Sequence, residues 1–462
     1  MRKETKKKKI FLFGKELIHL KINQIIILHL IFYGNSFTIF EKNFRSLKKL
    51  CYLFFILSLF SIGCSYKNDK DSEKNISDSL SIYFDLASQD TISYEKRLEY
   101  TDKAHEILTD QNNDTLNRKN LFKVANRYYN IKNYEKYKNV TFEIIKNSIA
   151  ENDTLDIAKA YMYLGDYHSN YTRKDSAYYY YKKAEKIYIK LNSKDNLANI
   201  YINIAKIQSY ENDYLGSELS AIKALNILRD INNLDNEYEA YSVLGIAACE
   251  LKEYDRAIEY HNKAVDLARK SNLNQLEISS INNIGYVYQS QNKDLKAIEK
   301  FEEALNYKSI NTLPDLQAIL LDNLAYSKFK TNNYSQLPKL FYDALKIRDS
   351  LQFTSGIIYS KIHLSEFYEK KSDLKTSQKF AKEALELSKS TKNYRAYLVS
   401  LKQIGVVEPE KASYYSNEYI KINDSLQQAE RRSKDKFARI SFETDEYIIQ
   451  NDRLEEQNRK II

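Results

Sequence analysis

The sequence predicts an all-α protein built as a solenoid of stacked helix pairs, and three observations point to this fold. Only nine of the 462 residues are Gly and three are Pro, so the turn-forming residues that sheets and barrels need are scarce. A small residue recurs at every fortieth position. Within each unit of forty, apolar residues are spaced by three and four, which places them on one face of a helix.

The formal net charge of +9 belongs to the start of the chain. Residues 1–50 contain twelve Lys or Arg and three acidic residues, which leaves 59 basic and 59 acidic residues in the remainder. A protein that binds nucleic acid needs its basic patch on the folded part, where phosphates are contacted. The balanced charge of residues 51–462 therefore excludes nucleic acid as a partner.

Residues 1–63 have the layout of a targeting region. Lys48 and Lys49 precede the apolar run 50–62, which is followed by Gly63 and Cys64. This is the order of a secretory signal, and the run is short for a membrane span of about 20 residues. An earlier apolar run, 17–33, is either a second membrane segment or upstream sequence from a misassigned start.

The segment from Ser61 to Cys64 resembles a bacterial lipoprotein box, although Ser61 stands where Leu is usual. The resemblance implies lipidation of Cys64 and a protein anchored to the membrane of the cell envelope on its extracytoplasmic side. An uncleaved membrane anchor is the alternative. The polar residues 64–78 lack apolar periodicity and fit a flexible tether.

The repeat defines the body of the chain, which we expect at residues 79–423. In each unit an aliphatic residue precedes the small one, and further small or apolar residues follow it at twelve, sixteen and nineteen positions. These offsets describe two helices that are joined by a turn and pack closely through their small residues. One such pair cannot bury its apolar stripe alone, so neighbouring pairs must stack. The small residues are Ala125, Gly165, Ala205, Gly245, Gly285, Ala325, Ser365 and Gly405.

This pattern resembles the tetratricopeptide repeat (TPR), with the best matches in the units around Gly165, Gly245 and Gly285. The resemblance implies a right-handed superhelix of about seven to eight forty-residue helix pairs. The Pro that usually closes each repeat in this family is missing. After Gly405 the spacing shortens, which predicts a shortened capping pair.

The residue pattern of 424–462 predicts one long, charged, coiled-coil-like helix. Its seam positions alternate by three and four, and they include polar residues that select register in coiled coils. We expect this seam, residues 437–461, to form a homodimer; a single amphipathic helix packed on the last repeat is the alternative. The seam consists of Phe437, Ile440, Thr444, Tyr447, Asn451, Leu454, Asn458 and Ile461.

The segments 423–426 and 436–445 resemble the juxtamembrane part of Bacteroidetes-type repeat-containing signalling proteins. In that family a transmembrane span and a DNA-binding or histidine-kinase output follow this helix. The chain ends at Ile462, where the span would begin. The resemblance thus implies either a truncated sensory half or a relative that works without an output domain.

No catalytic, metal or cofactor site is expected. The four His of the body, His105, His168, His261 and His363, lie in different units and form no metal-spaced pair. His261 stands at an aromatic core position and predicts a packed imidazole. Cys249 has no neighbouring Cys, and no phosphate loop or nucleophile motif is present. The sequence therefore predicts a protein that is not an enzyme.

The expected ligand site is the concave surface formed by the first helix of each pair. Asn203, Asn283 and Asn323 occupy equivalent positions there. In similar repeats such an Asn bonds a peptide backbone, because its amide both donates and accepts; a structural bond to the adjacent helix is the equal alternative. Four further residues are candidates for ligand contact: Lys206, Tyr286, Gln289 and Tyr326.

These predictions are compatible with two functions from different classes. The first is a peptide- or protein-binding scaffold of the cell envelope that is not an enzyme. The second is the sensory half of a transcriptional regulator or histidine kinase. A cytoplasmic scaffold is a third possibility if residues 1–63 are not a signal.

Overall fold

The computed structural model describes residues 78–171 and 174–461, and every regular element in these ranges is a helix. The chain divides into two units, Met1–Asp85 and Leu86–Ile462. In the first unit the described residues, 78–85, are helical. The second unit contains the repeats.

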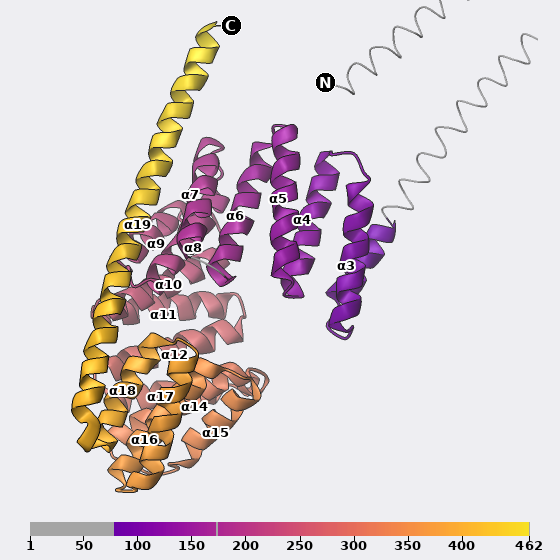
Figure 1. Cartoon of the computed structure of the whole chain (residues 1–462). Coiled ribbons are helices and arrows are strands. Elements are labelled where there is room, and N and C mark those ends of the chain that lie inside the picture. The colour runs from indigo at the N-terminus through magenta and orange to yellow at the C-terminus, as the bar shows by residue number, and fades with distance from the viewer. Residues whose placement is uncertain (1–77, 172–173, 462) are drawn as a thin grey trace, which may run out of the picture. The chain divides into compact units, whose positions relative to one another are not determined.

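The second unit is a series of antiparallel helix pairs, each packed on the next (Figure 1). The all-α solenoid fold and the number of pairs predicted from the forty-residue spacing are confirmed. After α3 (Tyr94–Thr109), the seven pairs are α4 (Thr115–Asn130) and α5 (Tyr134–Ala150), α6 (Thr154–Tyr171) and α7 (Lys174–Lys190), α8 (Lys194–Tyr210) and α9 (Tyr214–Leu228), α10 (Leu234–Glu250) and α11 (Tyr254–Lys270), α12 (Asn274–Ser290) and α13 (Asp294–Leu305), α14 (Pro314–Lys330) and α15 (Lys339–Ser350), α16 (Thr354–Lys370) and α17 (Leu374–Ser390).

The turns between helices use other residues at the positive-φ positions where Gly is common. Most helices are followed, two positions after their last residue, by a residue with positive φ, and none of these residues is Gly. After α8, for example, Asn212 has φ 60°, and the N–H of Asp213 bonds back to the carbonyl of Gln208 at 2.7 Å. Asp213 then accepts a hydrogen bond from Gly216 N and caps α9. One Asn-Asp step thus ends one helix and starts the next.

The small residues let the two helices of a pair approach closely. Gly165, Gly245 and Gly285 each lie against a ring sixteen residues later, from Tyr181, His261 and Phe301. A Cβ at any of the three would overlap that ring. The apolar clusters continue from one pair to the next, as in the cluster that joins residues of α11 to α14. The core is therefore continuous along the solenoid.

The last pair differs from the others. Helix α18 (Tyr394–Val407) is followed by the short 3-10 helix η2 (Pro409–Lys411) and by α19 (Ala412–Ile461), which runs without a break for 50 residues. Its first turns pack on α18 as the shortened cap, and Tyr415 belongs to that core cluster. The boundary predicted between residues 423 and 424 therefore lies inside one helix, because the capping helix and the charged helix are continuous.

Helix α19 also returns to an early part of the solenoid (Figure 1), where it packs on α7. Phe437 stacks on Tyr178 with ring centroids 4.6 Å apart, and Phe437 and Ile440 join the core cluster of α6, α7 and α8. Burial of two such side chains contributes roughly 1.5–3 kcal/mol each. Thr444 is buried as well, whereas Leu454 is exposed.

This contact changes the interpretation of the predicted seam. Phe437, Ile440 and Thr444 were expected to pack on a second copy or on the last repeat. In the structure they are buried in the same chain against α7, near the start of the solenoid. The apolar residues of the seam do pack against a partner helix, but this helix is α7 of the same chain and not a second copy of α19. The homodimer through 437–461 therefore lacks support at these three positions.

Candidate ligand groove

The candidate ligand surface consists of the residue that directly follows the small residue in the first helix of five pairs. Lys206, Ile246, Tyr286, Tyr326 and Glu366 stand at equivalent positions on α8, α10, α12, α14 and α16, and we refer to them as the first-helix face. The first three are exposed and the last two are half-buried. Because the fold repeats every forty residues, these side chains form one row along the solenoid.

Neighbouring repeats contact each other along this face. Lys206 Nζ lies 2.9 Å from a carboxylate oxygen of Glu239 in α10. Tyr326 stacks on His363 of α16, with ring centroids 4.4 Å apart. Burial, together with the nearby carboxyl of Glu366, raises the pKa of Tyr326 to about 12. The predicted ligand residues Lys206, Tyr286 and Tyr326 thus share one surface, although each belongs to a different pair.

The predicted Asn residues are half-buried and bond mainly to their neighbours. Asn203 Nδ2 donates to Asn199 Oδ1 at 3.0 Å, one turn earlier in the same helix. Asn323 Nδ2 donates to Asn282 Oδ1 of α12 at 3.0 Å. Asn283 Oδ1 accepts a long bond of 3.5 Å from Asn282.

Gln289 completes this arrangement. Its Nε2 donates to the Asn323 carbonyl at 3.3 Å and to Ser327 Oγ at 2.9 Å, both in α14. Asn203, Asn323 and Gln289 thus each donate to a group within the solenoid. Asn283 differs, because among the described residues its amide nitrogen donates to no group, which leaves a donor available on this face.

A buried charged cluster that the repeat spacing did not predict lies beneath the face at α14–α16. Arg348 Nη1 donates to Asp322 Oδ2 at 2.9 Å and to the carbonyl of Gly356 at 3.0 Å. His363 Nδ1 lies 3.1 Å from the same Asp322 oxygen. Burial raises the pKa of Asp322, but His363 and Arg348 together lower it further, so the net shift is downward.

The sequence did carry a signal for this cluster. Asp322 stands where most other repeats have an apolar or uncharged residue, such as Met162, Ile202 and Ile362. A charge at such a position requires a buried partner. The partner, Arg348, lies on the second helix of the pair, where sequence spacing alone gives no hint of it.

A cavity of about 450 Å³ lies where the solenoid meets α19. The turn between α8 and α9 lines one side with Tyr210 and Tyr214, and α10 contributes Ile246 of the first-helix face. Helix α18 adds Arg395, and α19 lines the cavity with Leu426, Ala429 and Glu430. Arg395 and Glu430 form an ion pair of 3.0 Å across it. The cavity is therefore both aromatic and charged, and it adjoins the first-helix face.

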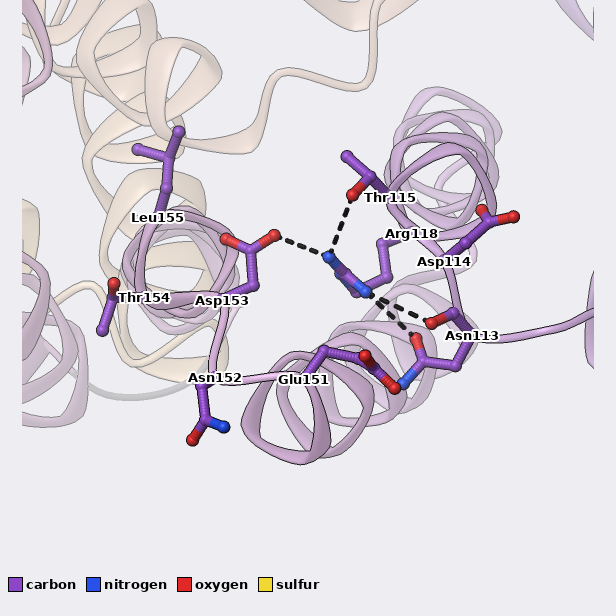
Figure 2. A pocket seen from close by; sticks show the side chains of 9 residues that line it. All are labelled: Asn113, Asp114, Thr115, Arg118, Glu151, Asn152, Asp153, Thr154 and Leu155. Atoms are coloured by element: carbon purple, nitrogen blue, oxygen red, sulfur yellow. Dashed lines mark hydrogen bonds and ion pairs between the residues drawn. The ribbon is translucent and has the colours of Figure 1, made fainter. Parts of the chain in front are cut away.

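A second cavity, of about 560 Å³, surrounds Arg118 at the turns before α4 and α6 (Figure 2). Arg118 is nearly fully buried and pairs with Asp153 at 2.6 Å and Asp156 at 3.0 Å. Figure 2 shows its guanidinium between Asp153 on one side and Asn113 and Thr115 on the other. Because the cation already has its partners, this arrangement ties two turns together and offers no free charge to a ligand.

The predicted lipidation site, Cys64, lies outside the described residues, as do the targeting region 1–63 and residues 64–77 of the tether. In the ranges that are described, no helix has the length and apolar character of a membrane span. The same ranges contain no group of three or more side chains that could hold a metal ion. His261 is buried against Gly245, and burial lowers its pKa to about 4.

Comparison with known proteins supports the repeat. A family model described as tetratricopeptide repeat matches residues 237–309. The transcriptional activator NprA of Geobacillus stearothermophilus is 28% identical over 184 residues, which cover 39% of this chain and 45% of that protein. The chain thus matches less than half the length of this relative.

Three solved structures share the fold. The apo form of RapI has a TM-score of 0.51 at 20% identity and covers 60% of this chain and 99% of its own. The Rap conjugation gene regulator of plasmid pLS20, in complex with the Phr* peptide, has a TM-score of 0.51 at 14% identity, covering 77% and 96%. A Rap protein complexed with competence and sporulation factor has a TM-score of 0.50 at 13% identity, covering 77% and 99%.

At these identities the likeness establishes the fold and leaves the function open. It agrees with the forty-residue spacing and with the helix pairs of α4 to α17. The repeat matched at residues 237–309 and the shared fold together support a tetratricopeptide-repeat protein.

Proposed function

We propose that this chain is a binding scaffold, not an enzyme, that holds a peptide or an extended protein segment against its first-helix face. The observation that carries the proposal is the row of exposed side chains from Lys206 to Tyr286, which leads into the cavity lined in part by α19. Aromatic and aliphatic groups beside a few charges suit a polypeptide ligand, because they bury its side chains and orient its polar groups.

Two of the solved solenoids support a polypeptide ligand. One is in complex with the Phr* peptide and the other with competence and sporulation factor. On this chain, Asn283 offers an amide donor toward such a backbone, and Tyr286 offers a half-exposed ring one turn away. We place the ligand between α8 and α14, where these residues lie.

Peptide retention tests the proposal. The full-length protein, immobilised, is incubated with a synthetic library of short random-sequence peptides, and the retained peptides are identified by mass spectrometry. We expect a defined subset that is lost in the double variant Asn283→Ala with Tyr286→Ala. The control is Asn262→Ala with Tyr254→Ala, on the second helix α11, and it should retain the same peptides. Retention that is equal in all three proteins would refute a ligand on the first-helix face.

A second candidate function is favoured by the relative NprA, a transcriptional activator. In this proposal the solenoid is the sensory part of a regulator, and α19 passes the effect of binding to an output, as the resemblance to Bacteroidetes-type signalling proteins implies. The DNA downstream of the codon for Ile462 distinguishes the two functions. A membrane span and output domain in any frame would support the sensor, and an unrelated gene would support the scaffold.

We also propose that the protein is anchored in the cell envelope through Cys64. The proposal is based on the signal layout of residues 48–64. Cells that express the protein and are fed a radiolabelled fatty acid should label the wild type and fail to label Cys64→Ala. Equal labelling of both proteins would contradict lipidation at Cys64, and no labelling of either would favour the cytoplasmic scaffold.

A further inference from the structure

The contact between α19 and α7 is unusual for a solenoid. Among the described residues, the other helices of the second unit that pack extensively are close neighbours in the chain, at most two helices apart, as expected for a repeat protein. Helix α19 packs on α18 and also on α7, and the helices of five complete pairs, α8 to α17, lie between them in the chain. Helix α19 thereby connects the end of the solenoid to α7, and the helices that carry the first-helix face lie between these two points of contact.

This connection has a mechanical consequence. In a solenoid each junction between pairs rotates slightly, and the rotations add along the array. Any ligand that changes these rotations moves α18 relative to α7. Because α19 is one continuous helix attached to both, it must either follow that movement or leave α7.

The α7–α19 contact is small enough to break. Phe437 and Ile440 are its buried apolar side chains. Its polar contacts include Lys436 with Asp175 and Lys186 with Asp445, the latter at 3.8 Å. Helix α19 also bonds to the turn after α8, where Asn212 donates to Glu430 and Glu211 accepts from Ser433, both at 2.6 Å. Most of these groups are partly exposed, and exposed ion pairs contribute little to stability.

The ligand site also reaches α19 directly. The cavity beside the first-helix face is lined by Ile246 of that face and by Leu426, Ala429 and Glu430 of α19. Arg395 of α18 bonds to Glu430, which also bonds to Asn212 of the turn after α8. A ligand that enters this cavity competes for Glu430, the residue on which both bonds converge.

We propose that the α7–α19 contact is a regulatory contact, in which binding of a peptide to the first-helix face releases residues 430–445 of α19 from the solenoid. The inference rests on the proposed function, since it requires a peptide ligand. By thermodynamic linkage, the factor by which the peptide shifts α19 toward release equals the factor by which the released state binds the peptide more tightly than the packed state. A variant that weakens the contact should therefore bind the peptide more tightly, up to that factor. Free and bound proteins then differ in whether the surface of α7 around Tyr178 and the apolar seam of α19 are available to a further partner.

Two phenylalanines of α19 provide a matched pair of variants. Phe437 is 3% exposed in the contact, whereas Phe442, five residues later, is 65% exposed. Phe437→Ala should release residues 430–445 in the absence of ligand, and Phe442→Ala should not. Lys436→Glu, which places a carboxylate beside Asp175, is a second variant that weakens the contact without removing a buried ring.

The experiment is hydrogen–deuterium exchange of the full-length proteins, with and without the peptides retained from the synthetic library. We expect exchange in residues 430–445 to rise by about tenfold or more in Phe437→Ala and Lys436→Glu without peptide, and in the wild type on adding peptide. The retained peptides should bind several-fold more tightly to both variants, while Phe442→Ala behaves as the wild type.

Two results would overturn the proposal, and they differ. If peptides are retained but leave exchange in 430–445 unchanged and bind equally to Phe437→Ala, the α7–α19 contact is packing alone and the proposed function stands. If no protein retains any peptide, the proposed function fails and the regulatory contact fails with it.

Discussion

Phe301 of α13 lies directly against the backbone of Gly285 in α12, so that no Cβ fits at position 285. The same relationship joins Gly165 to Tyr181 and Gly245 to His261. These three glycines therefore admit a ring between the two helices of a pair. The pair α14–α15 shows the alternative, since Ala325 there stands opposite the fully buried Phe341.

Gly285→Ala should destabilise the protein by about 1–3 kcal/mol, the usual cost of overpacking a core, because the α12–α13 pair must open to fit the new methyl group. The control is Gly405→Ala, where the nearest side-chain atom would lie 3.8 Å from the Cβ. That variant should gain about 0.5–1 kcal/mol from the better helix propensity of Ala. Urea unfolding of both variants measures the difference; equal effects would contradict the packing argument.

At the turns between helices, substitution by Gly should stabilise the protein. Lys252, in the turn that follows α10, has φ 63° and is exposed, and a side chain in this left-handed conformation costs roughly 1–2 kcal/mol. Lys252→Gly should therefore stabilise the protein by up to about 1 kcal/mol, once the greater flexibility of Gly in the unfolded chain is subtracted. Asn272→Gly at the next turn should gain less, because Asn tolerates this conformation. Thermal unfolding of the two variants tests the order.

Arg348 and Asp322 form a buried pair whose loss should be severe. Arg348→Met removes the cation and leaves Asp322, 2% exposed, with His363 as its remaining charged neighbour. Removing one partner of a buried pair costs about 3–5 kcal/mol. The same substitution at Arg256, whose pair with Glu218 lies at the surface, should cost less than about 1 kcal/mol. Similar losses for both would show that the buried pair has no special importance.

The sequence predicted the repeated part of this structure and missed the parts that occur once. Helix pairs follow from spacings that recur seven times, so the evidence for each pair supports all the others. The bond from Asn323 to Asn282, the Asp322–Arg348 pair and the stacking of Phe437 on Tyr178 depend on combinations of two side chains that each occur once. The forty-residue spacing does not predict these contacts, and the stacking of Phe437 on Tyr178 joins residues near opposite ends of the solenoid.

In the candidate site, too, the repeat spacing predicts some features and misses others. That Lys206, Tyr286 and Tyr326 share a face follows from their equal spacing. The bonding of Asn203, Asn283 and Asn323 does not, although they too are equally spaced, because the partner of each amide is a neighbour whose identity changes between repeats. Spacing predicts position, whereas the hydrogen bonds depend on local composition.

His261 should make the stability of the protein depend on pH. Its ring is 1% exposed, Nδ1 has no hydrogen-bond partner among the described residues, and burial lowers its pKa from 6.5 to about 4. Between these values the unfolded chain binds a proton that the folded chain does not. The contribution of a neutral His261 is therefore complete above pH 6.5 and is lost as the pH falls toward 4.

From pH 7 to pH 5 this linkage should remove about 2 kcal/mol from the free energy of unfolding. His261→Phe keeps an aromatic ring against Gly245, as Phe301 does against Gly285, and has no group that titrates. Urea midpoints measured at both pH values should fall more steeply for the wild type than for this variant. Because the other titrating groups are common to both proteins, the difference in slope isolates His261, and parallel slopes would mean that its imidazole is protonated in the folded state.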